Sequence, residues 1–443
     1  MAEENRGSDE MTEENPKAEE QKLGLLSRVR SEFSFIRGNF LVLALSWLVM
    51  DLASEMPSTY YGLYVKALGG SASIIGLIGS VSMFFQALVQ IPGGYLADKY
   101  GRRWLISTMT FGIALSQVFY AFAPNWQWLM VGAVVQSVCF IYRPALQAII
   151  ADSLPADRRG MGFSIITLIN SVSTTPSPLI AGWLFQAYGL VPSVRMGYTF
   201  VLVAFLIAGV IRLRLKETLE DPPKIDFGEM AGSIPAAIRE SISVWGKVPR
   251  SAFALFTTDV LLMGSISIFM PIMVLYIVED LGIPEMSWAI ILTSLFISMI
   301  ILSIPCGKII DKYGKKRPLI AAYIIWIATV PLFVYGDFYR LLLAMILVGL
   351  MQVTLMSASA ALQADLVPSE HRGKVSGSSN FFTLIAAAIG NLLGGYIYDN
   401  VSHTLPWWLQ IVFVAPCIFI IYFFVKEPKV EPVQAEDSQA SEP

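Results

Sequence analysis

Long apolar stretches separated by short polar turns dominate this chain of 443 residues. Each stretch is close to the roughly 20 residues that a helix needs to cross about 30 Å of hydrocarbon. Because lipid offers no partners for backbone polar groups, such stretches are expected to be helical. The pattern predicts twelve transmembrane helices, at 40–63, 73–96, 104–122, 127–150, 161–186, 196–213, 253–278, 286–308, 318–335, 340–364, 375–398 and 406–425.

Polar segments divide the chain into five parts. An acidic cytoplasmic tail with a juxtamembrane segment, 1–38, precedes the first six helices, 39–214. A cytoplasmic linker with an amphipathic helix, 215–252, leads to the second six, 253–426. The polar tail 427–443 ends the chain. The predicted fold is therefore an all-α polytopic membrane protein.

The two sets of six helices carry related sequences. Pro92–Arg103 reads Pro-Gly-Gly-Tyr-Leu-Ala-Asp-Lys-Tyr-Gly-Arg-Arg. After an offset of 213 residues, Pro305–Lys316 reads Pro-Cys-Gly-Lys-Ile-Ile-Asp-Lys-Tyr-Gly-Lys-Lys. The same offset relates Asp152 to Asp365. Separated blocks that share one offset indicate a tandem duplication, so we expect two pseudo-symmetric six-helix bundles.

The first copy of the repeat resembles a known motif. Gly94-x-Leu96-Ala97-Asp98-Lys99-x-Gly101-Arg102-Arg103 is similar to the loop between helices 2 and 3 of the major facilitator superfamily. The usual form there is Gly-x-Leu-Ala-Asp-Arg-x-Gly-Arg-Arg/Lys, and Lys99 is the only departure. The resemblance covers the whole membrane portion. It implies a transporter but does not name the cargo.

Helix 5 bears on the kind of transporter. Drug:proton antiporters of the superfamily often carry Gly-x-x-x-Gly-Pro-x-x-Gly-Gly there, and this chain has Ser173-x-x-x-Ser177-Pro178-x-x-Ala181-Gly182. The small residues persist, although most glycines are replaced. The Arg that those antiporters carry in the outer half of helix 4 is missing from 131–137. The chain is closest in pattern to the 12-helix drug:proton antiporters.

The resemblance also implies a conformational latch. In the family, the Asp at the end of helix 2 contacts the start of helix 11 in the other half. Here Asp98 would meet 374–378, while Arg102, Arg103 and Arg159 are candidates to pair with carboxylates such as Asp152. The alternative is that these charges only fix topology and turns. The residues assigned to the latch are Gly94, Asp98, Gly101, Arg102, Arg103, Asp152, Arg159, Gly307, Asp311, Gly314, Asp365 and Arg372.

Two carboxylates lie deep in helix 1, at Asp51 and, one turn further along, Glu55. An ionisable group at that depth costs about 2.5–3.5 kcal/mol, so it should face a cavity or a partner. Arg143 in helix 4 is the basic residue placed well inside a predicted span. We expect an Asp51/Glu55–Arg143 cluster in which the surplus acid carries a proton. The alternative is a structural ion pair between helices 1 and 4. Asp259 in helix 7 is a further candidate.

The cargo should meet helices 1, 4, 7 and 10, which line the central cavity of facilitator folds. Polar, aromatic and methionine side chains on these helices are the candidates for substrate contact. For each of them, the alternative is ordinary packing between helices. The predicted substrate-binding residues are Arg143, Trp47, Tyr60, Gln136, Tyr142, Met263, Met270 and Gln352.

Composition agrees with a membrane protein. Hydrophobic residues make up 55% of the chain, charged residues 15%, and the mean hydropathy is +0.60. The three cysteines lack the spacing of a metal or redox site, so no cofactor is expected. The expected partners are a small-molecule substrate, protons (with sodium as the alternative ion) and the lipid bilayer, with no nucleic acid. The chain is expected to be a monomer.

Lys and Arg gather in the loops on one side, including Arg212, Arg214 and Lys216. By the positive-inside rule, both termini lie in the cytoplasm and the protein spans the plasma membrane. The expected function is proton-coupled export of an amphipathic or cationic compound. The alternatives are a proton symporter or facilitator for a sugar or organic anion held by Arg143, and a non-transporting receptor or scaffold. An enzyme is not expected, because no nucleophile–base set or phosphate loop stands out.

Overall fold

A computed structural model describes residues 37–99, 101–154, 159–219, 239, 243–368 and 372–427, without the side chains of 91, 98 and 159–164. Most of the predicted tails and linker lie outside these residues. The first half comprises α2 (Gly38–Ser58), α3 (Tyr61–Ala67), α4 (Ala72–Lys99), α5 (Arg103–Ala121), α6 (Trp126–Cys139), η1 (Phe140–Tyr142), α7 (Arg143–Ser153), α8 (Arg159–Thr174), α9 (Ser177–Tyr188) and α10 (Leu190–Arg212).

The second half begins after a short 3₁₀ turn of the linker, η3 (Val244–Gly246). Its elements are α12 (Arg250–Phe269), η4 (Met270–Ile272), α13 (Met273–Leu275), the π-helical turn η5 (Tyr276–Asp280), α14 (Glu285–Tyr313), α15 (Lys316–Val334), α16 (Phe338–Leu366), α17 (Arg372–Asn400) and α18 (Leu405–Phe424).

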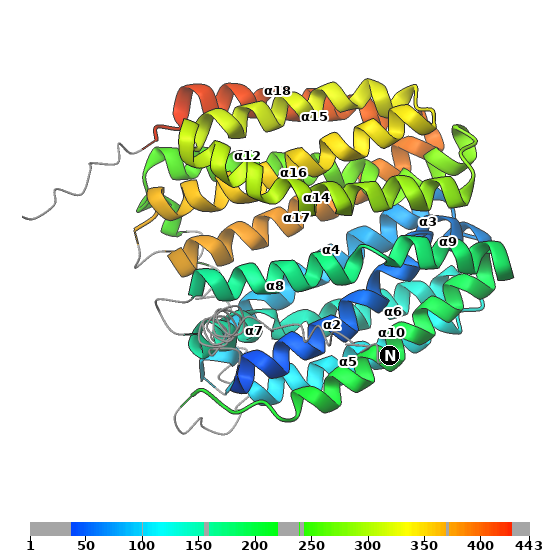
Figure 1. The fold of residues 1–443 in the computed structure, drawn as a ribbon, viewed down its shortest axis with the longest axis horizontal. Coiled ribbons are helices and arrows are strands. Elements are labelled where there is room, and N and C mark those ends of the chain that lie inside the picture. Colours follow the sequence, from blue (N-terminus) through cyan, green and yellow to red (C-terminus); the bar gives the residue numbers. More distant parts are fainter. Residues whose placement is uncertain are drawn as a thin grey trace, which may run out of the picture.

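The two halves lie side by side, with α4 of the first half alongside α17 of the second at their boundary (Figure 1). A second contact joins α9 to α14. Glycines permit the close approach of α4 and α17. A Cβ on Gly76 would lie 2.3 Å from the carbonyl oxygen of Asn391, and one on Gly395 would lie 2.3 Å from that of Ala72. The predicted architecture, a helical membrane protein of two six-helix bundles, is confirmed.

Eleven helical stretches of the described residues are long and apolar enough to cross a membrane. The remaining predicted span, 161–186, is not one continuous helix. It divides into α8 and α9 between Thr174 and Ser177, where Pro176 interrupts the run. A proline removes a backbone donor and clashes with the preceding turn, which explains the break.

Three further predicted spans are interrupted by a short turn or break. Pro57 precedes the end of α2, Pro144 opens α7 and Pro271 lies in the 3₁₀ turn η4. Pro57 and Pro271 both line the cavity between the halves. The breaks therefore bring irregular backbone to a cavity wall, where a membrane protein can tolerate it.

A carboxylate caps the helix that follows the first repeated loop. Glu217 accepts hydrogen bonds from the backbone N–H groups of Arg102 (2.9 Å) and Arg103 (2.9 Å) at the start of α5. The Arg102 guanidinium pairs with Asp152 at the end of α7. The loop turns at Gly101, whose φ of 96° is one that L-residues rarely adopt. We call this side of the molecule the Glu217 end.

The second half repeats the arrangement. Glu427 accepts a hydrogen bond from the Lys315 N–H at 2.6 Å, and the Lys315 ammonium pairs with Asp365. Gly314 again has a positive φ, 81°, and a Cβ there would lie 2.9 Å from the Glu427 carboxylate. The duplicated sequence thus builds one brace in each half, joining the start of the third span to the ends of the fourth and sixth spans of that half.

The Glu217 brace makes folding stability depend on pH. Burial raises the pKa of the Glu217 carboxyl, but backbone N–H donors, among them those of Arg102 and Arg103, outweigh it and hold the pKa below its ordinary value. A carboxyl whose pKa is lower in the folded state stabilises the fold above its unfolded pKa. This contribution is lost as the pH falls through the folded pKa.

Glu217→Gln is therefore expected to lower the thermal midpoint in detergent at neutral pH by a loss of about 1 kcal/mol, typical of a helix cap. The difference from the unmodified protein should shrink as the pH falls through the depressed pKa. Glu285→Gln is the control, because that side chain makes no hydrogen bond with the described residues. Equal midpoints for Glu217→Gln and the unmodified protein at pH 7 would contradict this account.

Candidate functional site

A cavity of about 780 Å³ lies between the two halves. Residues from both halves form its wall, and Glu55 is the one charged side chain among the described residues that line it. This volume is in the range that encloses a drug-sized molecule. The candidate site is therefore a large chamber with a single negative charge.

The two walls of the cavity differ in chemistry. The second half contributes mostly apolar side chains, including Met270, Met299 and Phe296, with Gln352 as its polar amide. The first half contributes hydroxyl, phenol and amide groups, with Gln86 among them. Such a chamber can hold a molecule with one apolar face and one polar or cationic face. The other polar lining residues of the first half are Ser54, Ser58, Thr59, Tyr61, Ser82, Gln117, Tyr120, Gln136, Ser137, Asn170, Ser171, Thr174 and Tyr198.

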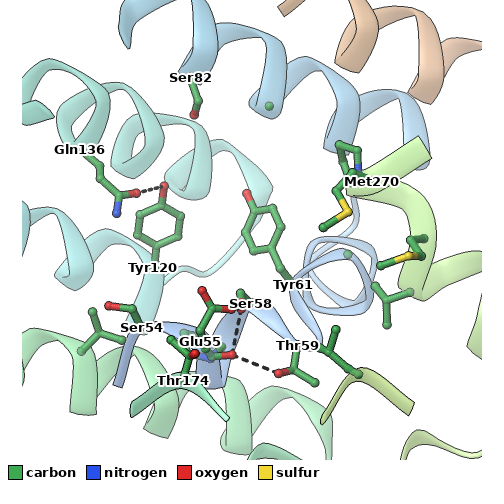
Figure 2. A pocket seen from close by; sticks show the side chains of 18 of the residues that line it. Ser54, Glu55, Ser58, Thr59, Tyr61, Ser82, Tyr120, Gln136, Thr174 and Met270 are labelled. Carbon is green, nitrogen blue, oxygen red and sulfur yellow. Dashed lines mark hydrogen bonds between the residues drawn. The ribbon is translucent and has the colours of Figure 1, made fainter. Parts of the chain in front are cut away.

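Glu55 stands near the broken end of α2. Its carboxylate accepts a hydrogen bond from Ser58 Oγ at 2.9 Å, and its backbone oxygen accepts one from Thr59 Oγ1 at 3.0 Å. Figure 2 shows the rings of Tyr61 and Tyr120 facing the same space as Glu55. A cation held by this carboxylate would also meet aromatic rings, which attract positive charge.

Aromatic residues of α5 and α10 form the back of the polar wall. The Tyr120 and Tyr198 rings stack with centroids 4.8 Å apart. Tyr120 donates its hydroxyl proton to Gln136 Oε1 at 3.2 Å (Figure 2). These contacts fix the phenol orientation and leave the Gln136 side chain on the cavity wall.

Asp51, the other predicted proton carrier, lies one turn before Glu55 on α2. Its carboxylate accepts a hydrogen bond from Asn170 Nδ2 of α8 at 3.1 Å. Asn170 lines the cavity, whereas Asp51 does not. Asp51 is therefore linked to the chamber through a neutral amide.

The expected cluster of Arg143 with these acids is not formed. Arg143 Nη1 donates to Gln86 Oε1 at 3.1 Å, and the guanidinium lies 4.0 Å from the centroid of the Phe140 ring. Among residues 37–99 and 101–154, no ion pair joins Arg143 to Asp51 or Glu55. The break at η1 sets the direction of α7, and Arg143, its first residue, meets α4 rather than α2.

The structure divides the other predicted substrate contacts into two groups. Gln136, Gln352 and Met270 line the cavity; Trp47, Tyr60, Tyr142, Met263 and Arg143 do not. Trp47 and Tyr142 pack in the core of the first half, and Tyr60 is 1% exposed. Whether a residue lines the cavity depends on how its helix is rotated about its own axis. A helix that is apolar on all sides gives little sequence signal for that rotation.

A buried arginine was missed. Arg212 of α10, which the sequence analysis assigned to a loop, is 0% exposed. It donates to Ser46 Oγ at 3.0 Å and to Thr110 Oγ1 at 2.8 Å, while its Nη2 has no partner among the described residues. Its charge acts on Asp51. The sequence already indicated a buried position, because Arg212 falls inside the predicted span 196–213.

One end of the cavity is closed by contacts between the halves. Lys66 Nζ lies 2.5 Å from Glu279 Oε2, and Asp399 accepts hydrogen bonds from the first backbone N–H groups of α4, including that of Ser73 at 2.6 Å. Tyr60 donates to the carbonyl of Glu285 at 2.7 Å. We call this side the Glu279 end. Two further hydrogen bonds join the halves here, from Trp288 Nε1 to the carbonyl of Thr59 at 3.0 Å and from Ser73 Oγ to the carbonyl of Gly395 at 3.3 Å.

The described charged residues of the predicted latch make contacts within one half, and Arg102 forms the expected pair with Asp152. Arg102 with Asp152, and Lys315 with Asp365, each stay inside their own half. Arg103 Nη2 donates to the carbonyl of Leu213 at 3.0 Å. The charges of one loop face the ends of neighbouring helices in the same bundle, so they brace that bundle.

The remaining latch residues fall into four groups. The side chains of Asp98 and Arg159 lie outside the described part, so the predicted contact of Asp98 with 374–378 stays a prediction. Arg372 donates to the carbonyls of Val367 and Ala364 in its own half. Asp311 is exposed. Gly94 and Gly307 both have open space where a Cβ would stand.

Two helical bundles that enclose a chamber between them define the class of polytopic membrane transporters. The sequence model of the Major Facilitator Superfamily matches residues 43–268 and 255–442. The chain belongs to this superfamily, and it is a multi-pass membrane protein that carries a small-molecule substrate.

Relatives and solved structures agree with this assignment. The chain is 25% identical over 378 residues to multidrug resistance protein MdtG of Enterobacter lignolyticus, covering 81% of this chain and 86% of that protein. It is 27% identical over 413 residues to the multi-drug resistance efflux pump PmrA of Streptococcus pneumoniae, covering 89% and 96%. The nucleoside transporter NupG has the same fold, with a TM-score of 0.60, 16% identity and coverage of 88% and 98%.

Proposed function

We propose that this protein is a proton-coupled exporter of amphipathic organic cations. The observation that carries the proposal is the charge of the cavity, where Glu55 is the one charged side chain in the wall. The apolar face of the second half suits the hydrophobic body of such a molecule. The efflux pumps named among the relatives support export as the direction.

The proposed orientation places both termini and the Glu217 end in the cytoplasm, because Lys and Arg gather there. The same topology gives the proposed boundaries of the linker, which begins after residue 214 and ends at residue 252. The Glu279 end is then the extracellular side, and the contacts there describe a conformation closed to the outside. Transport would proceed by rocking of the two halves about the midplane cavity, with Asp98 as a latch on the cytoplasmic side.

Competition at the carboxylates supplies the coupling in this proposal. A cation and a proton cannot both neutralise Glu55, so proton entry from outside would release the cargo, and Asp51 would accept protons beside it. Exchange of one monovalent cation for one proton moves no net charge, so the pH difference drives it and the membrane potential does not. At about 1.4 kcal/mol per pH unit, each unit sustains a cation gradient of about tenfold.

The test is efflux of a fluorescent lipophilic cation from energised cells that express the protein. We expect efflux that a protonophore abolishes and that Arg143→Gln leaves within about threefold, because Arg143 lies outside the cavity wall. If the protein moves an organic anion instead, and Arg143→Gln abolishes that movement, Arg143 holds the cargo and the exporter proposal fails. Efflux that depends on sodium and resists the protonophore would reject proton coupling but would leave cation export standing.

A further inference from the structure

A second, smaller cavity lies in the second half, away from the chamber between the halves. Its volume is about 10 Å³, close to the least that one water needs. One face of α12 supplies Asp259 and the residues one and two turns before it. The wall is completed by α16, α17 and Trp245 of the linker. The full lining is Trp245, Ala252, Leu255, Phe256, Asp259, Gln363, Val367, Val375 and Ser379.

Three polar side chains of this cavity are unusual because they bond to no described residue. The side chains of Asp259, Gln363 and Ser379 face the cavity from three helices, and none makes a hydrogen bond within the described part of the chain. Burying a carboxylate without a donor is costly. A proton on Asp259 removes that charge and gives the carboxyl a donor for the amide or hydroxyl oxygen opposite.

Few charged groups surround Asp259 that could neutralise its carboxylate. Among the described residues, no other charged side chain lines this cavity. Of the titratable groups on neighbouring helices, Tyr323 of α15 and Cys417 of α18 act electrostatically on Asp259. The Tyr323 hydroxyl is itself buried without a partner among the described residues. A basic partner is therefore absent from the described lining, and protonation is the way in which this carboxyl can lose its charge there.

The linker covers the site. Trp245 stacks on Phe256 with ring centroids 4.0 Å apart, and its Nε1 donates to Ser378 Oγ of α17 at 2.8 Å. Asp259 lies nine residues after the start of α12, about 14 Å along the helix from the Glu217 end. Through its stacking on Phe256 and its hydrogen bond to Ser378, Trp245 joins α12 to α17, the helix that packs against α4 of the other half.

We propose that Asp259, with Gln363 and Ser379, is a second proton-binding site, covered by Trp245, and that its proton also crosses the membrane in each transport cycle. This inference rests on the proposed function, in which Glu55 and Asp51 serve the cation cavity. The occupant is a proton, because the three polar side chains supply too few oxygen ligands to replace the hydration shell of a metal cation. The site places a coupling carboxylate in each half of the molecule.

The experiment counts protons in vesicles that contain only the purified full-length protein. With the membrane potential clamped to zero, the tetraphenylphosphonium gradient at equilibrium is measured at several imposed pH differences. We expect about two decades of gradient per pH unit for the unmodified protein and about one decade for Asp259→Asn. Equal slopes for the two proteins overturn the inference while leaving proton coupling intact. No response of the unmodified protein to pH overturns the proposed function as well.

A second measurement does not depend on folding of the Asn variant. A hydrophobic carbodiimide modifies protonated carboxyls, and mass spectrometry locates the product. We expect modification of Asp259 in the unmodified protein at acidic pH, and about tenfold faster modification in Trp245→Ala, where the cover is removed. Trp245→Phe, which keeps the aromatic stacking, should resemble the unmodified protein. Absence of modification in all three proteins at every pH would refute the site.

Discussion

Glu55→Gln is expected to weaken binding of tetraphenylphosphonium by about 10- to 100-fold, or about 1.4–2.8 kcal/mol. The reason is that Glu55 is the one charged side chain of the cavity wall, so the variant leaves a neutral chamber. In the unmodified protein, binding should weaken as protons compete at acidic pH. In the variant, binding should be independent of pH across the same range. Titration of the detergent-solubilised protein at several pH values measures both effects.

Two further variants separate the roles of the carboxylates. Glu55→Asp keeps the charge and should retain binding that depends on pH. Asp51→Asn should affect binding less than Glu55→Gln, because Asp51 reaches the cavity only through Asn170. Unchanged affinity in Glu55→Gln would show that the cavity charge does not hold the cation.

The second large effect is expected at the Glu279 end. In Lys66→Cys/Glu279→Cys, a short bifunctional methanethiosulfonate should link the halves and reduce transport at least about tenfold, because the cavity could no longer open there. Dithiothreitol should restore transport. The native cysteines, Cys139, Cys306 and Cys417, are buried and should not compete for the reagent. Transport of the labelled cation in vesicles, before and after reduction, measures the effect.

Lys315→Cys/Asp365→Cys is the matched control. That pair lies in one half, so a link between its members should leave transport unchanged. Full activity of the linked Lys66→Cys/Glu279→Cys protein would show that the halves need not separate at this end.

The fold follows from the sequence because a membrane restricts the choices. Apolar length defines the spans, and the repeated offset of 213 residues between the two loops indicates two similar bundles. The breaks were harder to predict, although Pro57, Pro176 and Pro271 mark them. A proline in a membrane helix can kink it or end it, and the neighbouring helices decide which.

The candidate site could be predicted in part. Glu55, Gln136 and Gln352 line the cavity, and all three stand out as polar groups in apolar spans. Tyr61 and Tyr120 were missed, because hydropathy says little about which face of an apolar helix meets a cavity. The partner of Arg143 was wrong for a related reason, since rotation after the break at η1 turns it toward Gln86.

The central claim is exchange of organic cations for protons through the Glu55 cavity. Its most direct test uses vesicles that hold only the purified protein, an acidic interior and a membrane potential clamped to zero. We predict that external tetraphenylphosphonium accumulates inside, that protein-free vesicles show no accumulation, and that Glu55→Gln abolishes it. If the cation only equilibrates while an organic anion accumulates, the protein does not exchange organic cations for protons.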